Sequence, residues 1–188
     1  MRSVTLSGCA GSLVGIKAHT APLQEGSSMQ GKTEIIELLN EVLTSELTAI
    51  NQYYAHYKMC QDWGFHGLAK SFREFSMEEM KDADEIMERI LFLDGLPNMQ
   101  RLGPVTIGEN PEEQIELLRQ AEAAAVERLN RGIALCRDMN DNGSRQMLEK
   151  MLIDEEEHLD WAEAQQHVIK TIGASRYLAE KLGESNSN

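Results

Sequence analysis

DEEEHLD, residues 154–160, decides the fold of this chain, because it sets two side chains of types that can bind metals into a helical pattern. Glu155 and His158 are three residues apart, a spacing that keeps both on one face of a helix. The same face carries, in steps of three and four, Leu148, Met151, Ala162, Gln165, Ile169 and Ile172. Two polar side chains of the ligand type therefore interrupt a largely apolar stripe, and such a stripe predicts a buried helix face.

A second stretch, EEMKDAD at residues 78–84, repeats this arrangement with one change. Glu79 is followed three residues later by Asp82, where the first stretch has histidine. The same helix face also carries Leu68, Phe72, Phe75, Ile86 and Ile90. Because acidic runs usually lie on solvated faces, the other glutamates are predicted to face solvent, namely Glu78, Glu156 and Glu157.

Two further glutamates, Glu46 and Glu122, interrupt apolar helix faces of their own. Glu46 precedes Glu79 by 33 residues and Glu122 precedes Glu155 by 33, so the chain consists of two matching halves. Burying four carboxylates without compensation costs on the order of several kcal/mol per ion. Bound cations remove this cost, and one Glu from each of two helices with Glu-x-x-His from the other two is a di-iron ligand set. These residues predict a di-iron site inside a helical core.

Helical periodicity runs through the chain from Thr33, interrupted by a few Gly and Pro residues. The expected helices cover residues 33–61, 67–93, 111–139, 145–172 and 175–182, with Asn110 capping the third and Ser144 the fourth. Residues 94–110 show no helical period and form a long connection. Two hairpins joined by such a crossover predict an all-α fold, a four-helix bundle of ferritin-like topology with a short fifth C-terminal helix.

The composition limits the possible functions. A formal net charge of -13 disfavours nucleic-acid binding, which needs a concentrated basic face, and favours cations as ligands. No apolar run reaches the roughly 20 residues that a membrane-spanning helix needs. The cysteines Cys9, Cys60 and Cys136 are far apart and form no CxxC pair, which fits a reducing compartment. We expect one soluble, cytoplasmic globular domain without a nucleic-acid or membrane partner.

Residues 1–28 differ from the rest, because they are rich in Ser, Gly and Ala and contain no acidic residue before Glu25. A targeting segment is one interpretation, and LSGC at residues 6–9 is similar to a lipoprotein cleavage box. Too few residues precede its cysteine, however, to form the apolar part of a signal peptide. We expect a disordered N-terminal extension or an upstream start codon, with Met29 as the alternative start, followed by the bundle domain at 29–188.

Four segments of the chain resemble bacterioferritin, namely ELTAINQYYAHYKM (46–59), EEMKDADEIMERILFLDGLPNMQ (78–100), IGEN (107–110) and DEEEHLDWAE (154–163). The resemblance extends from Met29 to about Leu182, and ILFLDGLPN is its most specific part. It implies an iron-storage subunit of a hollow shell of twenty-four copies, which oxidises ferrous iron at a di-iron ferroxidase centre and keeps ferric mineral inside. It also implies haem b between pairs of subunits and a ferredoxin-type reductant.

The resemblance assigns roles to individual positions. The positions that match the family's ferroxidase ligands are Glu46, Glu79, Glu122, Glu155 and His158. Met80 matches the methionine that holds the haem, although a methionine is by itself more often a packing residue. Tyr53 matches a tyrosine near the site, although as a bare sequence feature it is a core residue. The remaining histidines, His19, His56, His66 and His167, are expected on the surface or in packing.

Asp82 departs from the family pattern EEMxHAD, which has histidine at this place. An aspartate oxygen is as many bonds from the backbone as an imidazole Nδ1, so Asp82 can reach the same iron as a histidine that binds through Nδ1. The charge differs, because four glutamates balance the +4 of two ferrous ions and a fifth carboxylate leaves -1. Extra negative charge stabilises ferric over ferrous iron. Oxidation then stays feasible while turnover slows.

Asp82 therefore has three interpretations. It is a working metal ligand, or it marks a haem-binding or structural subunit with an impaired centre, or it points outward and leaves one iron under-coordinated. In the second case the chain co-assembles with an active second bacterioferritin subunit. In the first, its substrates are ferrous iron and oxygen or peroxide. A di-iron oxygenase or peroxide-scavenging relative shares the ligand set and stays an alternative.

Overall fold

The structure of the protein is a computed structural model that describes residues 30–182. Five helices make up the fold, α1 (Thr33–Asp62), α2 (His66–Phe92), α3 (Pro111–Asp138), α4 (Asn142–Ile172) and α5 (Ala174–Glu180). Residues 30–182 contain no strand, so the predicted all-α fold with a short fifth helix is confirmed. The extension predicted at residues 1–28 lies outside the described residues.

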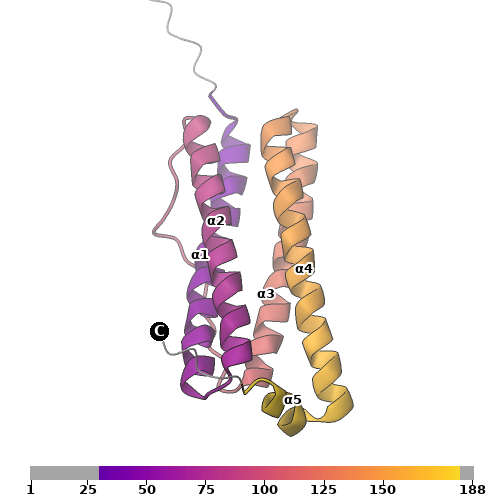
Figure 1. Ribbon diagram of the computed structural model, residues 1–188. Helices are drawn as coiled ribbons and strands as arrows, with labels where there is room; N and C mark the ends of the chain where they lie inside the picture. Colours follow the sequence, from indigo (N-terminus) through magenta and orange to yellow (C-terminus); the bar gives the residue numbers. More distant parts are fainter. Residues whose placement is uncertain (1–29, 183–188) are drawn as a thin grey trace, which may run out of the picture.

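The four long helices form two hairpins that lie side by side, α1 with α2 and α3 with α4 (Figure 1). Residues 93–110, which we call the crossover, leave the upper end of α2 and return along the bundle to its lower end, where α3 begins (Figure 1). Because the crossover spans the bundle, α2 and α3 run in the same direction. This is the long connection that the sequence predicts, and α5 lies at the lower end beside α4.

Side chains of α1 hold the crossover in place. Four of them accept hydrogen bonds from crossover backbone N–H groups, namely Asn40 (from Asn98, 2.7 Å), Thr48 (from Gly103, 2.8 Å), Gln52 (from Thr106, 3.0 Å) and His56 (from Gly108, 3.1 Å). Buried or half-buried backbone groups need such partners, and the crossover has no ladder of its own to supply them. These polar residues, which lie four or eight positions apart along α1, therefore fix the path of the connection.

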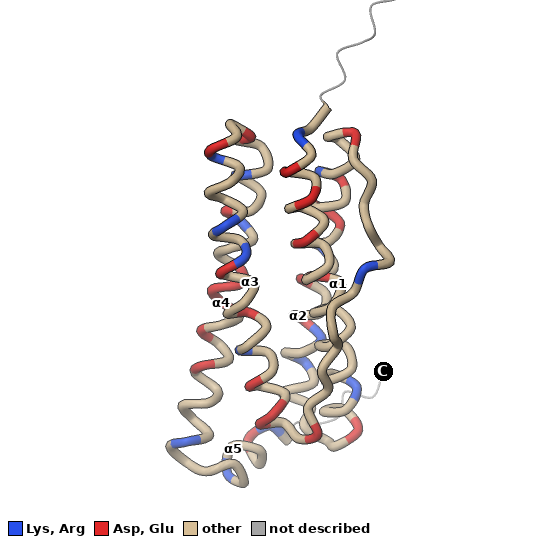
Figure 2. The backbone as a smooth tube through the Cα atoms, turned by 180° about the vertical axis from the view of Figure 1, so that it is seen from behind, with Lys and Arg blue, Asp and Glu red and all other residues tan. Residues whose placement is uncertain are grey.

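A polar layer divides the core of the bundle into two apolar clusters. The upper cluster includes Leu39, Val42, Ile86, Ile90, Leu129 and Leu148. The lower cluster includes Tyr53, Phe72, Leu118, Ala162 and Tyr177. Asp and Glu occur along every long helix (Figure 2), but the buried acids lie between the clusters at Glu46, Glu79, Asp82, Glu122 and Glu155. The inward faces predicted for α1, α2 and α3 are confirmed by burial.

The helix starts agree with the sequence at α3 and differ at α4. Asn110 caps α3 as expected, and its side chain accepts a hydrogen bond from the Glu113 N–H at 2.9 Å. The predicted Ser144 cap is wrong, because Asp141 caps α4 and accepts from the Ser144 N–H at 3.0 Å. Arg89 of α2 also pairs with Asp141 at 2.6 Å. A carboxylate held by an arginine is the stronger cap, so the helix begins at Asn142.

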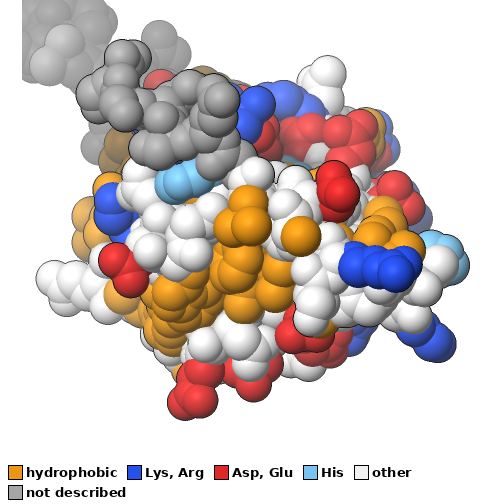
Figure 3. Space-filling view, turned by 60° about the horizontal axis from the view of Figure 1, so that its bottom comes forward, with side chains coloured by type: hydrophobic (Ala, Val, Ile, Leu, Met, Phe, Trp, Pro, Cys, Tyr) orange, Lys and Arg blue, Asp and Glu red, His pale blue; other side chains and the backbone are white. Residues whose placement is uncertain are grey.

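The lower end of α4 is less buried than the sequence predicts. Its inward face is buried as far as Ala162, whereas Ile172 is 40% exposed. Beyond Ala162 the covering element is α5, which turns back at Gly173 with a φ of 84° and buries Tyr177. The Tyr177 hydroxyl donates to Gln165 Oε1 at 3.0 Å. Figure 3, which looks at this end, shows hydrophobic side chains gathered between acidic ones.

Candidate metal centre

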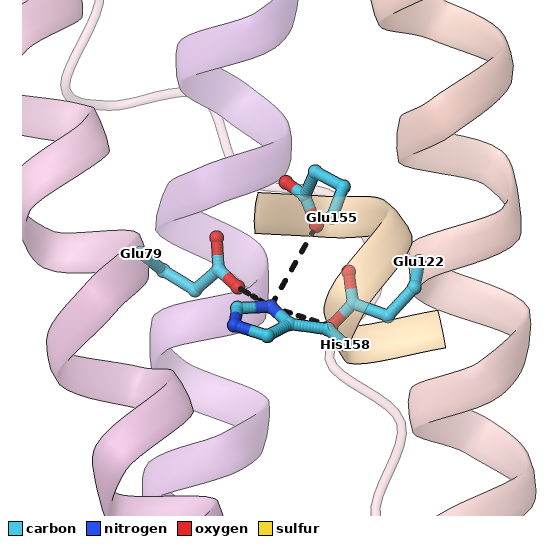
Figure 4. Close-up of side chains that lie close together, drawn as sticks. All are labelled: Glu79, Glu122, Glu155 and His158. Carbon is cyan, nitrogen blue, oxygen red and sulfur yellow. Dashed lines mark ion pairs between the residues drawn. The ribbon is translucent and has the colours of Figure 1, made fainter. Parts of the chain in front are cut away.

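Four side chains from three helices converge in the polar layer (Figure 4). We call them the four-residue group, and they are Glu79 of α2, Glu122 of α3, and Glu155 and His158 of α4. One ligand atom from each lies within 4.8 Å of all the others. The Nδ1 of His158 lies 3.4 Å from Glu79 Oε1, 3.7 Å from Glu122 Oε1 and 4.0 Å from Glu155 Oε2. Such a spacing places three carboxylates and one imidazole around a single point.

The group is buried and holds lone pairs that nothing in the described chain satisfies. Its three glutamates are 1–2% exposed and His158 is 7% exposed. Within residues 30–182, Glu79 Oε1, Glu155 Oε2 and His158 Nδ1 have no hydrogen-bond partner. Unsatisfied buried polar atoms are rare and costly. A divalent cation fits this donor set, because carboxylate oxygens and imidazole nitrogen are ordinary ligands of first-row metals.

The ionisation of the carboxylates also favours cations. Burial raises the pKa of Glu79 and of Glu122 well above the usual range, and the charge of Glu155 adds to the effect in both. Tyr53 opposes it at Glu122, where its hydroxyl donates to Oε1 at 2.7 Å. Protons therefore neutralise part of the cluster when no cation is bound. Metal ions can take over that role, because their charge stabilises the ionised carboxylates.

Glu46 lies on the α1 side of the group. Glu46 is 2% exposed. Its burial raises its pKa most strongly, and the negative charges of Glu155 and Glu79 raise it as well. Glu46 and Asp82 are not among the four residues whose ligand atoms are mutually close. The structure thus brings together four of the six predicted metal ligands directly and leaves the other two beside them.

Asp82 is buried next to the centre, with 7% exposure, so it does not project from the outer surface. It lines a cavity of about 280 Å³ between α2 and α4, to which His158 also contributes. Burial, together with the nearby carboxylates of Glu155 and Asp154, raises the pKa of Asp82 to about 6. Asp82 thus stands between the four-residue group and this cavity.

The prediction that Glu78 faces solvent is only partly right, because its carboxylate also contacts His158. Its Oε2 lies 3.0 Å from His158 Nε2, while its side chain stays 47% exposed. An acceptor at Nε2 favours the proton on that nitrogen and leaves the Nδ1 lone pair directed at the carboxylates. Sequence reasoning missed this contact because it joins α2 to α4. A signal existed in the spacing of four between Glu78 and Asp82, which places both on one side of α2.

The other predicted residues lie apart from the centre. Met80 is on the exposed side of α2, where its side chain is 47% exposed, close to the 43% of Met77. Glu156 and Glu157 are exposed, as the sequence predicts. His56 is a packing residue, as expected, and its ring meets that of Phe72 edge to face with centroids 5.3 Å apart.

Comparisons with known proteins agree with this fold. The family model described as Ferritin-like domain matches residues 36–172, which contain the four-residue group. The bacterioferritin of Mycobacterium bovis is 48% identical over 152 residues, 81% of this chain and 96% of that protein. The bacterioferritin of Streptomyces coelicolor is 46% identical over 157 residues, 84% of this chain and 94% of that protein. A bacterioferritin of Brucella melitensis is 40% identical over 149 residues, 79% and 92% of the two chains.

The fold and the buried carboxylate site define a ferritin-like protein. Within that class, the chain belongs to the bacterioferritin family. Membership supports iron storage as the function and iron as the metal. Among residues 30–182, no helix is both long enough and apolar enough to cross a membrane.

Proposed function

We propose that the protein oxidises ferrous iron at a di-iron ferroxidase centre and stores the ferric product. The observation that carries this proposal is the four-residue group, whose buried lone pairs converge without protein partners in the described chain. Glu46 and Asp82 complete the ligand set on the α1 and α2 side. Two ferrous ions lose one electron each, and this electron pair with two protons reduces O₂ to H₂O₂, or H₂O₂ to two water molecules.

The protein contributes position and charge to this reaction. Five carboxylates set a charge of -5 against the +4 of two ferrous ions, and the excess favours the ferric state. Tyr53 orients Glu122, and Glu78 orients His158 through Nε2. Groups that orient the ligands of a metal tune both its affinity and its chemistry. In this proposal Asp82 is a working ligand that supports oxidation and slows the release of ferric iron.

The test is stopped-flow oxidation of ferrous iron by the purified, iron-free protein at two Fe(II) per subunit. We expect a fast phase that saturates at this ratio, with the iron retained by the protein. Glu156→Gln serves as a matched control, since it removes an exposed carboxylate of α4 beside Glu155. Oxidation no faster than in buffer, with no iron retained, would contradict the proposal.

Storage requires a container, and we propose a hollow shell of twenty-four copies, of about 500 kDa for a 21.1 kDa chain. The family relationship supports this size. A di-iron oxygenase or a peroxide-scavenging relative would instead form a small oligomer, so light scattering separates these alternatives. We place the shell in the cytoplasm, which the buried free thiols Cys60 and Cys136 fit, with a ferredoxin-type reductant releasing the iron.

Haem b is part of the same proposal, with Met80 as its ligand. The exposed thioether on α2 fits this role, because a sulfur at the surface can meet a matching one from a second subunit. Bound haem would supply a path for electrons. The Met80→Ala protein should purify without the haem absorption band and keep its oligomeric size.

A second candidate function follows from Asp82, which lies outside the four-residue group. The chain would then be a haem-binding or structural subunit with an impaired centre, co-assembled with an active bacterioferritin subunit. A homomer that forms shells and lacks the fast oxidation phase supports this candidate. A fast phase in the homomer removes the need for it.

A further inference from the structure

The crossover forms part of the wall of a cavity that reaches the metal centre between α1 and α3. This cavity, which we call the α1/α3 cavity, has a volume of about 390 Å³. Four of the predicted metal ligands line it, namely Glu46, Glu79, Glu122 and Glu155. The crossover contributes Arg101, Gly103, Pro104 and Thr106. Because these crossover residues belong to no helix or strand, the contacts that hold them also control access to the centre.

His56 of α1 holds the lower end of the crossover through one hydrogen bond. The Gly108 N–H donates to His56 Nε2 at 3.1 Å, and both residues are buried. A backbone N–H can only donate, so this bond requires the lone pair of a neutral imidazole at Nε2. The other ring nitrogen, Nδ1, has no hydrogen-bond partner within residues 30–182. The bond to Gly108 is thus the only one that this ring makes in the described chain.

Both partners of this bond are tightly packed. The His56 ring lies edge to face against Phe72, and the Gly108 carbonyl accepts a hydrogen bond from Gln114 Nε2 at 3.1 Å. A Cβ on Gly108 would lie only 2.7 Å from the Gln114 backbone nitrogen, so this backbone is pressed against the first turn of α3. Neither partner can turn away without losing other contacts. A change at His56 is therefore transmitted to the crossover.

Protonation of His56 would replace the acceptor by a donor. An imidazolium carries hydrogen on both nitrogens, so Nε2–H would face the Gly108 N–H. Burial lowers the pKa of His56 from 6.5 to about 4, and the backbone of Thr106, which raises it, offsets burial only in part. The closed crossover is therefore favoured while the ring is neutral, and it loses this advantage as the pH falls from 6.5 to 4.

The groups packed around His56 offer no charge that would balance an imidazolium. On α2 it contacts Phe72, and on the crossover side Gly108 and Gln114 are uncharged. Burial raises the pKa of every titratable member of the lower cluster, so that these groups stay neutral below pH 7. They are Tyr53, Cys60 and Tyr177. The acids that follow Gly108 are exposed, namely Glu109, Glu112 and Glu113.

We propose that residues 104–108, which we call the strap, are an acid-released cover of the α1/α3 cavity, latched by the bond between His56 and Gly108. At neutral pH the strap is closed. In acid His56 gains a proton, the strap leaves α1, and the cavity opens to solvent. The ends of the strap stay fixed, because Gly103 is held by Thr48 and Asn110 caps α3. This device goes beyond the proposed ferroxidase function, since none of its groups is a predicted metal ligand.

Hydrogen exchange followed by mass spectrometry tests the strap in the iron-free oligomer between pH 7.5 and 5. The wild type is compared with His56→Gln, which keeps an acceptor and does not titrate. Division by the intrinsic exchange rate of each amide removes the chemical effect of pH. A pKa of about 4 when latched and 6.5 when released predicts about 30-fold more opening at pH 5 than at pH 7.5 in the wild type. The same opening in both proteins at every pH would overturn the inference.

The upper crossover is a control within the wild type, which decides the question even if His56→Gln folds poorly. There Asn40, which does not titrate, accepts from the Asn98 N–H at 2.7 Å. We expect residues 96–100 to show no acid-dependent opening, and light scattering to show a constant oligomer size. Equal opening of the upper crossover and the strap, or dissociation over the same pH range, would contradict a latch at His56.

Extraction of cobalt(II), a cation that oxygen does not readily oxidise, measures access to the centre. Loss of its visible absorption in excess EDTA should accelerate about fourfold more in the wild type than in His56→Gln when the pH falls from 7.5 to 6. Equal acceleration in both proteins would show that the strap does not control access. A wild type that binds no Co(II) would count against the proposed metal centre, whereas hydrogen exchange still decides the strap.

Discussion

The two hairpins of the bundle carry the same ligand spacing but support it differently. Counterparts in the two halves are separated by 76 residues, which pairs Glu46 with Glu122, Glu79 with Glu155, and Asp82 with His158. Tyr53 of α1 donates to Glu122, whereas the counterpart of Tyr53 in the second half is Leu129, which has no hydroxyl for Glu46.

His158 of the second half is likewise supported by a residue of the first half. Glu78 of α2 accepts a hydrogen bond from His158 Nε2, and its own counterpart is Asp154, which lines the cavity between α2 and α4. Residues of the first half thus position the ligands of the second half. The Asp82 side of the centre borders a cavity, so the two proposed metal positions differ in their surroundings as well as in charge.

The largest effect is expected from Glu155, because its charge acts on carboxylates of both halves. Glu155→Gln should slow ferrous oxidation roughly 1000-fold, equivalent to about 4 kcal/mol of lost stabilisation. Stopped-flow kinetics measure this loss.

Glu46→Gln, which changes the first half only, should keep one Co(II) site in a titration. Equal loss of both metal ions in Glu46→Gln would contradict the division into two unequal positions.

His56 tests a feature that the second half lacks, since its counterpart there is Gly132. Burial lowers the pKa of His56 from 6.5 to about 4, so between these values the unfolded chain binds a proton that the folded chain does not. Stability should therefore fall as pH drops from 6.5 to 4, by up to about 3 kcal/mol. Protonation of Nε2 also removes the acceptor for the Gly108 N–H.

The measurement is urea unfolding of the wild type and His56→Gln at a series of pH values between 7 and 4. Glutamine keeps a hydrogen-bond acceptor and does not titrate, so its stability should depend less on pH. His66→Gln is the matched control, because His66 begins α2 and is not fully buried. Parallel curves for His56→Gln and the wild type would exclude His56 as the cause.

Glu78 should matter chiefly through its contact with His158. Glu78→Ala removes the partner of Nε2 and should weaken Co(II) binding at the His158 site about 10- to 100-fold, the usual cost of losing such support. Glu78→Gln keeps an acceptor in the same place and should bind close to the wild type. The visible absorption of bound Co(II) reports the change. Equal weakening in Glu78→Gln would show that charge, rather than orientation, is what Glu78 provides.

Asp82→His makes the two halves more alike. It removes the fifth carboxylate, so that four negative charges face two ferrous ions, and turnover should increase about tenfold because ferric iron is held less tightly. Steady-state oxidation with excess Fe(II) measures turnover, and the fast first phase should be present in both proteins. A fast phase seen only in Asp82→His would instead favour the impaired subunit.

The smallest effect is expected from Tyr53→Phe, which makes the first half like the second at this position. It deletes the hydrogen bond to Glu122 and should cost about 1 kcal/mol in Co(II) affinity, or roughly fivefold. Calorimetry resolves such a difference. A change of more than about 100-fold would assign Tyr53 a larger part than orientation.

The sequence predicted the helix faces and the buried glutamates because a period of 3.6 residues puts Glu79 and Phe75 on the same side of α2. Within one helix, that rule needs no knowledge of neighbours. The rule does not predict contacts between helices. It therefore missed the contact of Glu78 with His158 of α4, and the cap at Asp141, whose strength depends on Arg89 of α2. The cavity beside Asp82 was out of reach for the same reason, since it arises from the packing of α2 against α4.

The crossover has a consequence for how this protein can vary over evolutionary time. Side chains of α1 hold it by its backbone N–H groups, and a backbone N–H is present in every residue except proline. The apolar side chains of the crossover take no part in this anchoring and are exposed, among them Leu102, Val105 and Ile107. Substitutions there can reshape the outer surface while the anchoring glutamine and histidine stay constant. The segment is thus a place where new contacts can arise without loss of the fold.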